Sequence, residues 1–181
     1  MTMVQMNERE VVSAIAALQD KLIQELGNIY DAEHRFLEAQ HLMLRQVTSN
    51  LVKSMLETHI LQTQQQIKNL EQVFSAMEIE PVRINCEAAS GLVIDGRKLM
   101  AAAATHPAVV DLAIAEVQSK VECFEIACYR ALISTIEQLG NSNIISLLKQ
   151  NLQQEEQTAQ LLEESFPELF EQVRMTTDSQ F

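Results

Sequence analysis

Four stretches of this 181-residue sequence repeat apolar residues with the spacing of an amphipathic helix, and polar residues interrupt each of them. The four apolar series span 15–47, 52–77, 110–132 and 148–162. The interrupting residues are Glu33 in the first series, His59 and Gln62 in the second, Glu125 in the third and Glu155 in the fourth. Residues spaced by three or four share one face of a helix. These polar side chains should therefore point into the interior of a helical bundle together with the apolar ones.

Carboxylates at interior positions need compensation, because burying an isolated charge costs several kcal/mol. Glu122 lies three residues before Glu125 and should share its helix face. Several carboxylates and one imidazole directed at one core therefore indicate a metal ion, and these ligands suit iron or manganese. Each residue taken alone has a simpler explanation. A Glu in such a position is more often hydrogen bonded or at the bundle edge, and a lone His is more often structural.

The composition favours helix, since the sequence contains only 4 Gly and 3 Pro. We expect long helices at 7–47, 51–77, 105–139 and 142–165, and one or two short helices within 86–104. Asn7, Thr105 and either Asn141 or Ser142 are the expected N-caps, and Gly140 is an expected terminator. Pro167 should end the last long helix, with at most one or two further turns before a frayed tail at 176–181.

The order of these elements predicts an all-α fold of one domain, 1–181, with its core at about 8–165. Two helices joined by a short turn, a long crossing connection with a short extra helix, and two more helices form a ferritin-like four-helix bundle. The Glu-x-x-His pattern typical of such bundles occurs literally only at Glu38 and His41. At about 100° per residue, that pair faces away from Glu33 and the core.

Charge and hydropathy exclude several classes of partner. The net charge of −12 disfavours nucleic acid, which needs a concentrated basic face. The longest apolar stretches are too short to cross a membrane, and the first residues do not form a signal peptide, so we expect a cytoplasmic protein. Cys86, Cys123 and Cys128 form no CxxC pair and no even set. They are expected to be small buried hydrophobes, with a redox or ligand role as the alternative.

Several segments resemble the YciF/YciE-like family of bacterial ferritin-like stress proteins. They are 27–33 (GNIYDAE), 59–71 (HILQTQQQIKNLE), 121–129 (VECFEIACY), 148–156 (LKQNLQQEE) and the connection around 86–92. The resemblance covers about residues 18–165. It implies a rubrerythrin-related bundle, a homodimer with the short extra helix near its interface, and a stress-linked role. Its implied metal-facing positions are Glu33, His59, Glu122, Glu125 and Glu155.

Three positions depart from the family pattern. Gln62 stands where relatives tend to have Glu, Cys123 where they have His, and Ala159 where they often have Asp. An amide oxygen is a poorer ligand than a carboxylate, and fewer carboxylates balance less metal charge. Two functions follow as hypotheses. One is a di-metal or mono-metal oxidoreductase acting on iron, oxygen or peroxide, and the other is a non-catalytic dimeric bundle that acts through protein interaction.

Overall fold

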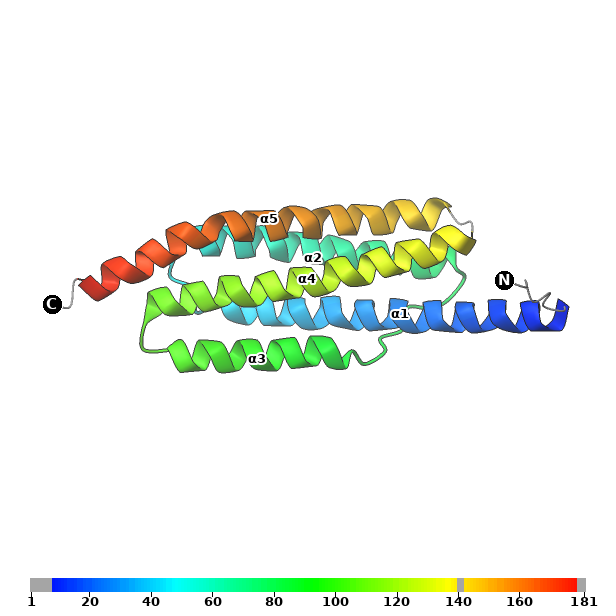
Figure 1. The fold of residues 1–181 in the computed structure, drawn as a ribbon, viewed down its shortest axis with the longest axis horizontal. Helices are drawn as coiled ribbons and strands as arrows, with labels where there is room; N and C mark the ends of the chain where they lie inside the picture. Colours follow the sequence, from blue (N-terminus) through cyan, green and yellow to red (C-terminus); the bar gives the residue numbers. More distant parts are fainter. Residues whose placement is uncertain (1–7, 140–141, 179–181) are drawn as a thin grey trace, which may run out of the picture.

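Five helices and no strand make up residues 8–139 and 142–178, the part of the chain that the computed structural model describes (Figure 1). The helices are α1 (Glu8–Met43), α2 (Asn50–Ala76), α3 (Glu87–Ala103), α4 (Pro107–Leu139) and α5 (Ser142–Asp178). None of them combines the length and the hydropathy that a bilayer crossing requires.

The helices α1, α2, α4 and α5 form the predicted four-helix bundle, and α3 lies on its outside against α1 and α4 (Figure 1). Few residues separate α1 from α2 and α4 from α5, and each pair is antiparallel (Figure 1). The connection with α3 crosses from α2 to α4. The ferritin-like connectivity predicted from the order of elements is therefore confirmed.

Asp111 on α4 holds the turn between α1 and α2. Its Oδ1 accepts a hydrogen bond from the Thr48 amide at 2.8 Å. Its Oδ2 accepts from the Thr48 hydroxyl at 2.6 Å and from the Ser49 amide at 2.9 Å. Three donors satisfy this buried carboxylate, so it fixes where α2 begins relative to α4.

Gly27 allows the crossing connection to pack directly on α1. A Cβ at this position would lie 2.6 Å from the Cγ1 of Ile84, and the Ile84 amide donates to the Gly27 carbonyl at 3.0 Å. Glycine inside a helix can mark either a kink or a close contact with another segment. The structure shows that Gly27 marks a close contact.

The ends of the helices differ from the predicted ones in several places. The first helix ends at Met43 rather than 47, and 86–104 holds a single helix. The helix α4 begins at Pro107, so Thr105 lies one position too early to be its N-cap. The expected caps Asn7 and Asn141 and the terminator Gly140 lie outside the described residues.

The prediction that Pro167 ends the last helix is wrong, because α5 continues to Asp178. Proline inside a helix removes one hydrogen bond and costs about 3 kcal/mol. Beyond it, Leu169 is buried and Val173 packs on the same apolar cluster, as does Phe166 just before the proline. This packing offsets the cost of the proline. Residues 176–178, expected to be frayed, belong to the helix as well.

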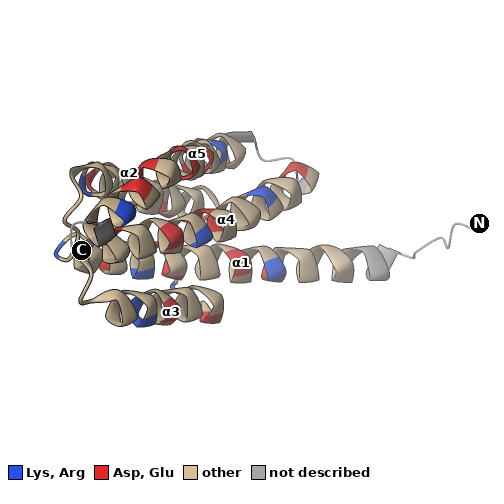
Figure 2. Cartoon of the chain, turned by 60° about the vertical axis from the view of Figure 1, so that its left-hand side comes forward, with Lys and Arg blue, Asp and Glu red and all other residues tan. Residues whose placement is uncertain are grey.

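The interior is divided into two apolar clusters with polar residues between them. One cluster includes Leu26, Phe74 and Leu148, and the other includes Met43, Ile114 and Leu162. The N-terminal part of α1 extends beyond the other helices, as Figures 1 and 2 show. Ile15, predicted to be a core residue, is therefore exposed.

Candidate metal centre

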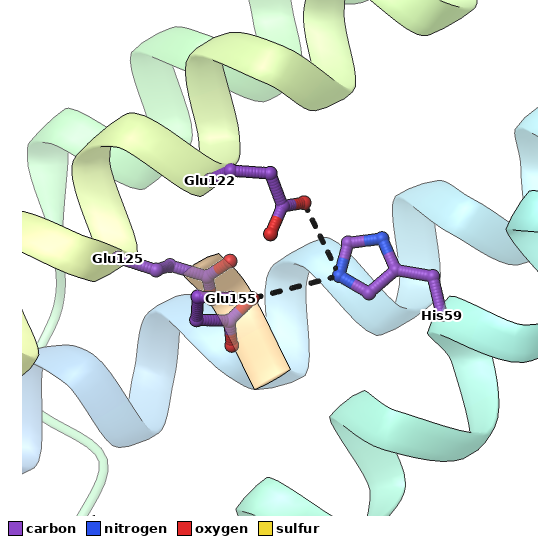
Figure 3. Close-up of side chains that lie close together, drawn as sticks. All are labelled: His59, Glu122, Glu125 and Glu155. Carbon is purple, nitrogen blue, oxygen red and sulfur yellow. Dashed lines mark ion pairs between the residues drawn. The ribbon is translucent and has the colours of Figure 1, made fainter. Parts of the chain in front are cut away.

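Four buried side chains from three helices converge between the two apolar clusters (Figure 3). They are His59 on α2, Glu122 and Glu125 on α4, and Glu155 on α5. Each offers one nitrogen or oxygen atom, and these four atoms all lie within 4.8 Å of one another. The side chains are at most 3% exposed. We refer to these four residues as the His–Glu cluster.

Most of the polar atoms in the His–Glu cluster lack a hydrogen-bond partner. His59 Nε2 lies 3.3 Å from Glu122 Oε1 and 3.9 Å from Glu155 Oε2. Neither that nitrogen nor any oxygen of Glu122 or Glu155 meets a hydrogen-bond donor from outside the cluster, and the same holds for Oε1 of Glu125. Glu122 and Glu155 can hydrogen bond to each other only when one of the two carboxyls is protonated. Leaving a buried polar group unpaired costs about 1–3 kcal/mol. A protein interior seldom tolerates so many unless a further group is bound.

The pKa values show how the cluster avoids holding several charges. Burial lowers the pKa of His59 to about 4, so the imidazole is neutral at physiological pH. Burial also raises the pKa of Glu155 to about 7. Burial and the neighbouring carboxylates raise the pKa of Glu122 and Glu125 well above the usual range. Without a cation, the cluster therefore favours protonated carboxyls beside a neutral ring.

Glu33 on α1 lies next to the His–Glu cluster and is fully buried. Burial and the charge of Glu155 raise its pKa well above the usual range. The Tyr129 hydroxyl donates a short hydrogen bond to Glu33 Oε1, while Oε2 has no partner. Glu33 therefore keeps one oxygen free for a further contact.

Asn151 fixes the direction of the Tyr129 hydrogen bond. Its Nδ2 donates to the Gln66 carbonyl at 3.2 Å and to the Tyr129 hydroxyl at 2.9 Å. Its Oδ1 accepts from Asn69 at 2.7 Å. Because a carbonyl can only accept, the amide group must face Gln66, and this settles the orientation of Asn151. The Tyr129 hydroxyl then accepts from Asn151 and has its own hydrogen left for Glu33.

Gln118 on α4 determines which ring nitrogen of His59 carries the hydrogen. Its amide nitrogen lies 2.8 Å from His59 Nδ1, and with this orientation the ring hydrogen is on Nε2. Turning the amide over would bring its oxygen to Nδ1, which would then carry the hydrogen. In that tautomer the Nε2 lone pair faces the carboxylates and can bind a cation.

Gln62, a predicted ligand, hydrogen bonds with Thr158 on α5. It is only partly buried, and its Oε1 accepts a hydrogen bond from the Thr158 hydroxyl at 3.2 Å. Gln66 is the buried polar residue that sequence reasoning missed. It is 0% exposed, and both atoms of its amide lack a partner. Its position seven residues after His59, two turns along the same face, was the signal that could have found it.

The cysteines differ from one another in environment, and the structure shows all three as free thiols. Cys86 is buried as predicted and accepts a hydrogen bond from the Ala89 amide at the start of α3. Cys128 is partly buried, and burial raises its pKa to about 12. Cys123 is exposed, so the prediction of a buried residue is wrong there. None of the three belongs to the His–Glu cluster.

The residues of the His–Glu cluster fit a bound cation. The donor set of one imidazole and three carboxylates is one that iron and manganese accept. No hydrogen-bond donor outside the cluster reaches the unpartnered atoms of His59, Glu122 and Glu155 among the described residues. Fold and site together define a ferritin-like helical bundle with a buried carboxylate–imidazole cluster.

The chain belongs to the family described as a domain of unknown function, DUF892, whose sequence pattern matches residues 17–174. It is 29% identical to protein YciF of Escherichia coli K12 over 142 residues, covering 78% of this chain and 85% of that protein. The resemblance inferred from the sequence is thereby confirmed.

Two solved structures share the fold. The crystal structure of the Escherichia coli stress protein YciF matches with a TM-score of 0.80 and 26% identity, covering 85% of this chain and 97% of that one. YcfI from Rhodopseudomonas palustris matches with a TM-score of 0.78 and 34% identity, covering 81% and 92%. These similarities support the helical bundle fold.

Proposed function

We propose that the protein binds iron or manganese in the His–Glu cluster and uses the ion in oxygen or peroxide chemistry. The observation that carries this proposal is the set of buried donor atoms without partners on His59, Glu122, Glu125 and Glu155. A cation would satisfy all of them at once. It would also offset the repulsion among the carboxylates that raises their pKa values.

His59, Glu122, Glu125 and Glu155 would hold the ion, with Glu33 beside them. Such an ion supplies Lewis acidity and a change of oxidation state. The protein supplies the surroundings. Two apolar clusters exclude water on either side, and Tyr129 orients Glu33 through a hydrogen bond.

Burial raises the pKa of Glu155 to about 7, so this carboxyl is close to half-protonated at neutral pH. It can therefore release a proton when a cation binds and take one up when the cation leaves.

The cellular setting is part of the same proposal. The relative from Escherichia coli is described as a stress protein, and we infer a stress-linked, cytoplasmic role for this chain. We also propose a homodimer. The end of α1 that extends beyond the bundle supports it, since Val12 and Ile15 are 67% and 47% exposed there and a second copy could cover them. Light scattering coupled to size-exclusion chromatography tests the dimer.

Metal content per chain tests the proposed site. Untagged protein is expressed with iron and manganese both supplied and analysed by plasma mass spectrometry. One or two atoms per chain are expected, with loss in His59→Ala and Glu155→Gln. The matched control is Glu156→Gln. Glu156 is next to Glu155 in the sequence, but its carboxylate is exposed and pairs with Arg130. Equal metal loss in the control would overturn the assignment.

The alternative is a non-catalytic dimeric bundle with a degraded metal site that acts through protein interaction. One observation favours it. Gln62, which stands where relatives tend to have Glu, is engaged with Thr158 and brings no charge to the cluster. Near-zero metal, with an unchanged melting temperature after either ion is added, would support this alternative and exclude the first function.

A further inference from the structure

The side chain of Gln66 on α2 is buried without any hydrogen-bond partner. It is 0% exposed, and among the described residues neither the oxygen nor the nitrogen of its amide makes a hydrogen bond. A buried amide is destabilising unless its acceptor and its donors are satisfied. An apolar side chain at this position would serve the fold better. The amide of Gln66 therefore indicates a contact with a group from outside the chain.

The other buried amide side chains bond within the fold. The buried amides of the described residues are those of Gln40, Gln66, Asn69, Gln118 and Asn151. Gln40 donates to the Thr63 hydroxyl at 3.2 Å, and Asn69 donates to Asn151 at 2.7 Å. Gln118 contacts the His59 ring at 2.8 Å. Within this set, Gln66 alone has both side-chain atoms unpaired.

The register between α2 and α5 places Gln66 beside the His–Glu cluster. Hydrogen bonds across these helices pair Gln62 with Thr158 and Asn69 with Asn151. A step forward along α2 from the first pair to the second is an equal step backward along α5, so the helices are antiparallel here. On this register Gln66 lies opposite 154–155, and therefore at the level of Glu155.

A hydrogen-bond network also connects the main chain of Gln66 with the site. Its carbonyl accepts from Asn151 Nδ2 at 3.2 Å, and the same nitrogen donates to the Tyr129 hydroxyl at 2.9 Å. Tyr129 in turn donates to Glu33, whose Oε2 has no partner. Side chains of a helix lean toward its N-terminus. On α2 this is the direction of His59, so the amide of Gln66 should lean toward the cluster.

An amide group suits a place beside this cluster. Its oxygen is a neutral donor of the carbonyl type, which manganese accepts alongside carboxylates. The cluster already contains three carboxylates, so a neutral donor adds a ligand without adding repulsion among charges. While the oxygen contacts a cation, the nitrogen keeps two hydrogens for a carboxylate oxygen such as Glu33 Oε2.

We propose that the amide oxygen of Gln66 is a further donor to the cation held by the His–Glu cluster. This inference rests on the proposed function, because it assigns a residue to the same centre. Two consequences can be measured separately. The metal-free fold should not need the amide, and tight binding of the cation should.

The test compares Gln66→Leu with the wild-type protein, both metal-free and with manganese. Metal-free Gln66→Leu should melt at the same temperature or higher, because the lost amide had no partner. Calorimetric titration should show a manganese affinity weakened by about tenfold. The matched control is Gln72→Leu, exposed on the same helix, where the amide contacts the Lys68 carbonyl at 3.4 Å. The control should change neither value.

Gln66→Glu separates a ligand role from a packing role. Glutamate has nearly the shape of glutamine and keeps a side-chain oxygen at the same place. The manganese affinity of Gln66→Glu should therefore return close to that of the wild-type protein. An affinity as weak as that of Gln66→Leu would overturn the proposal, because the oxygen would then have no part in binding.

The remaining outcomes separate this inference from the proposed function. A lower melting temperature of metal-free Gln66→Leu would overturn the inference, since the amide would then serve the fold, for example through a buried water. Equal manganese affinity in the wild-type protein and Gln66→Leu would remove Gln66 from the centre and leave the His–Glu cluster in place. Wild-type protein that binds neither manganese nor iron would overturn the proposed function, and the ligand role of Gln66 with it.

Discussion

Two groups of buried acids in this bundle have opposite surroundings. Asp31 on α1 is 4% exposed and is fully paired. Its carboxylate accepts from Arg35 at 2.5 Å, from Arg83 at 3.1 Å and from the Cys86 amide at 3.0 Å. The His–Glu cluster is equally buried, and no cation from Lys or Arg reaches it among the described ion pairs.

The pKa values follow this difference. Burial by itself raises the pKa of Asp31, but hydrogen bonds from Arg35, Cys86 and Arg83 outweigh it and hold the pKa below the usual range. In the cluster, burial is unopposed by any cation, and the pKa of Glu155 rises to about 7. The comparison shows that an acid paired within the chain serves the fold. Acids left unpaired at the same depth indicate a partner from outside the chain.

The largest expected effect is that of removing the paired acid. Asp31→Leu should lower the free energy of unfolding by about 2–4 kcal/mol, because the Cys86 amide and two arginines lose their acceptor. Urea unfolding measures it, with and without added manganese, and the loss should be equal in both. Glu38→Gln, an exposed change on the same helix, is the control and should stay within about 0.5 kcal/mol. An unchanged free energy of unfolding in Asp31→Leu would contradict the structural role of this carboxylate.

Removing an unpaired acid should have the opposite sign. Glu125→Leu should raise the free energy of unfolding of metal-free protein by about 1–2 kcal/mol, because an apolar side chain replaces a buried carboxyl whose Oε1 has no partner. It should also abolish the rise in melting temperature that manganese produces. Glu125→Gln, which keeps a polar group there, should not stabilise. If Glu125→Leu destabilises the metal-free protein, the cluster holds together without a cation.

Asn151 tests the polar residues that support the cluster. Asn151→Leu should cost about 1–3 kcal/mol in metal-free protein, since Asn69, Tyr129 and the Gln66 carbonyl each lose a partner. It should also weaken manganese binding by about tenfold, because Tyr129 no longer directs its hydrogen to Glu33. Calorimetric titration measures the affinity, with the exposed change Gln153→Leu as control. Lower stability with unchanged affinity would restrict Asn151 to a structural role.

The smallest expected effect is the pH dependence of the metal-free protein. A carboxyl whose pKa is raised on folding stabilises the fold below its unfolded pKa, and this stability is lost as the pH rises through the folded value. For Glu155 the interval runs from 4.5 to about 7. His59 opposes it, since its pKa falls from 6.5 to about 4 and its burial favours the fold at higher pH.

The net result should be a shallow fall in melting temperature between about pH 5 and pH 7, because the raised carboxyls outnumber the single histidine. Manganese affinity should rise over the same interval, since the carboxyls must release protons to bind the ion. Scanning calorimetry at several pH values measures the expected fall in melting temperature. A melting temperature that rises throughout this interval would mean that His59 dominates.

Much of the fold was predictable because it depends on local patterns. The spacing of apolar residues located the four long helices, and the short turn around Ser49 made the first pair antiparallel. Pro167 shows where local rules fail. Its helix-breaking tendency is local, but the burial of Leu169 that overrides it comes from helices distant in the sequence.

The candidate site was predictable for a similar reason and with a similar limit. Glu33, His59, Glu122, Glu125 and Glu155 all interrupt or extend apolar series, so the sequence by itself determined that they face the interior.

Only the tertiary structure decided which interior polar groups find partners, because a partner comes from another helix at matching depth. It paired Gln62 with Thr158 and directed Tyr129 to Glu33. It also brought His59 and three carboxylates within 4.8 Å of one another without partners.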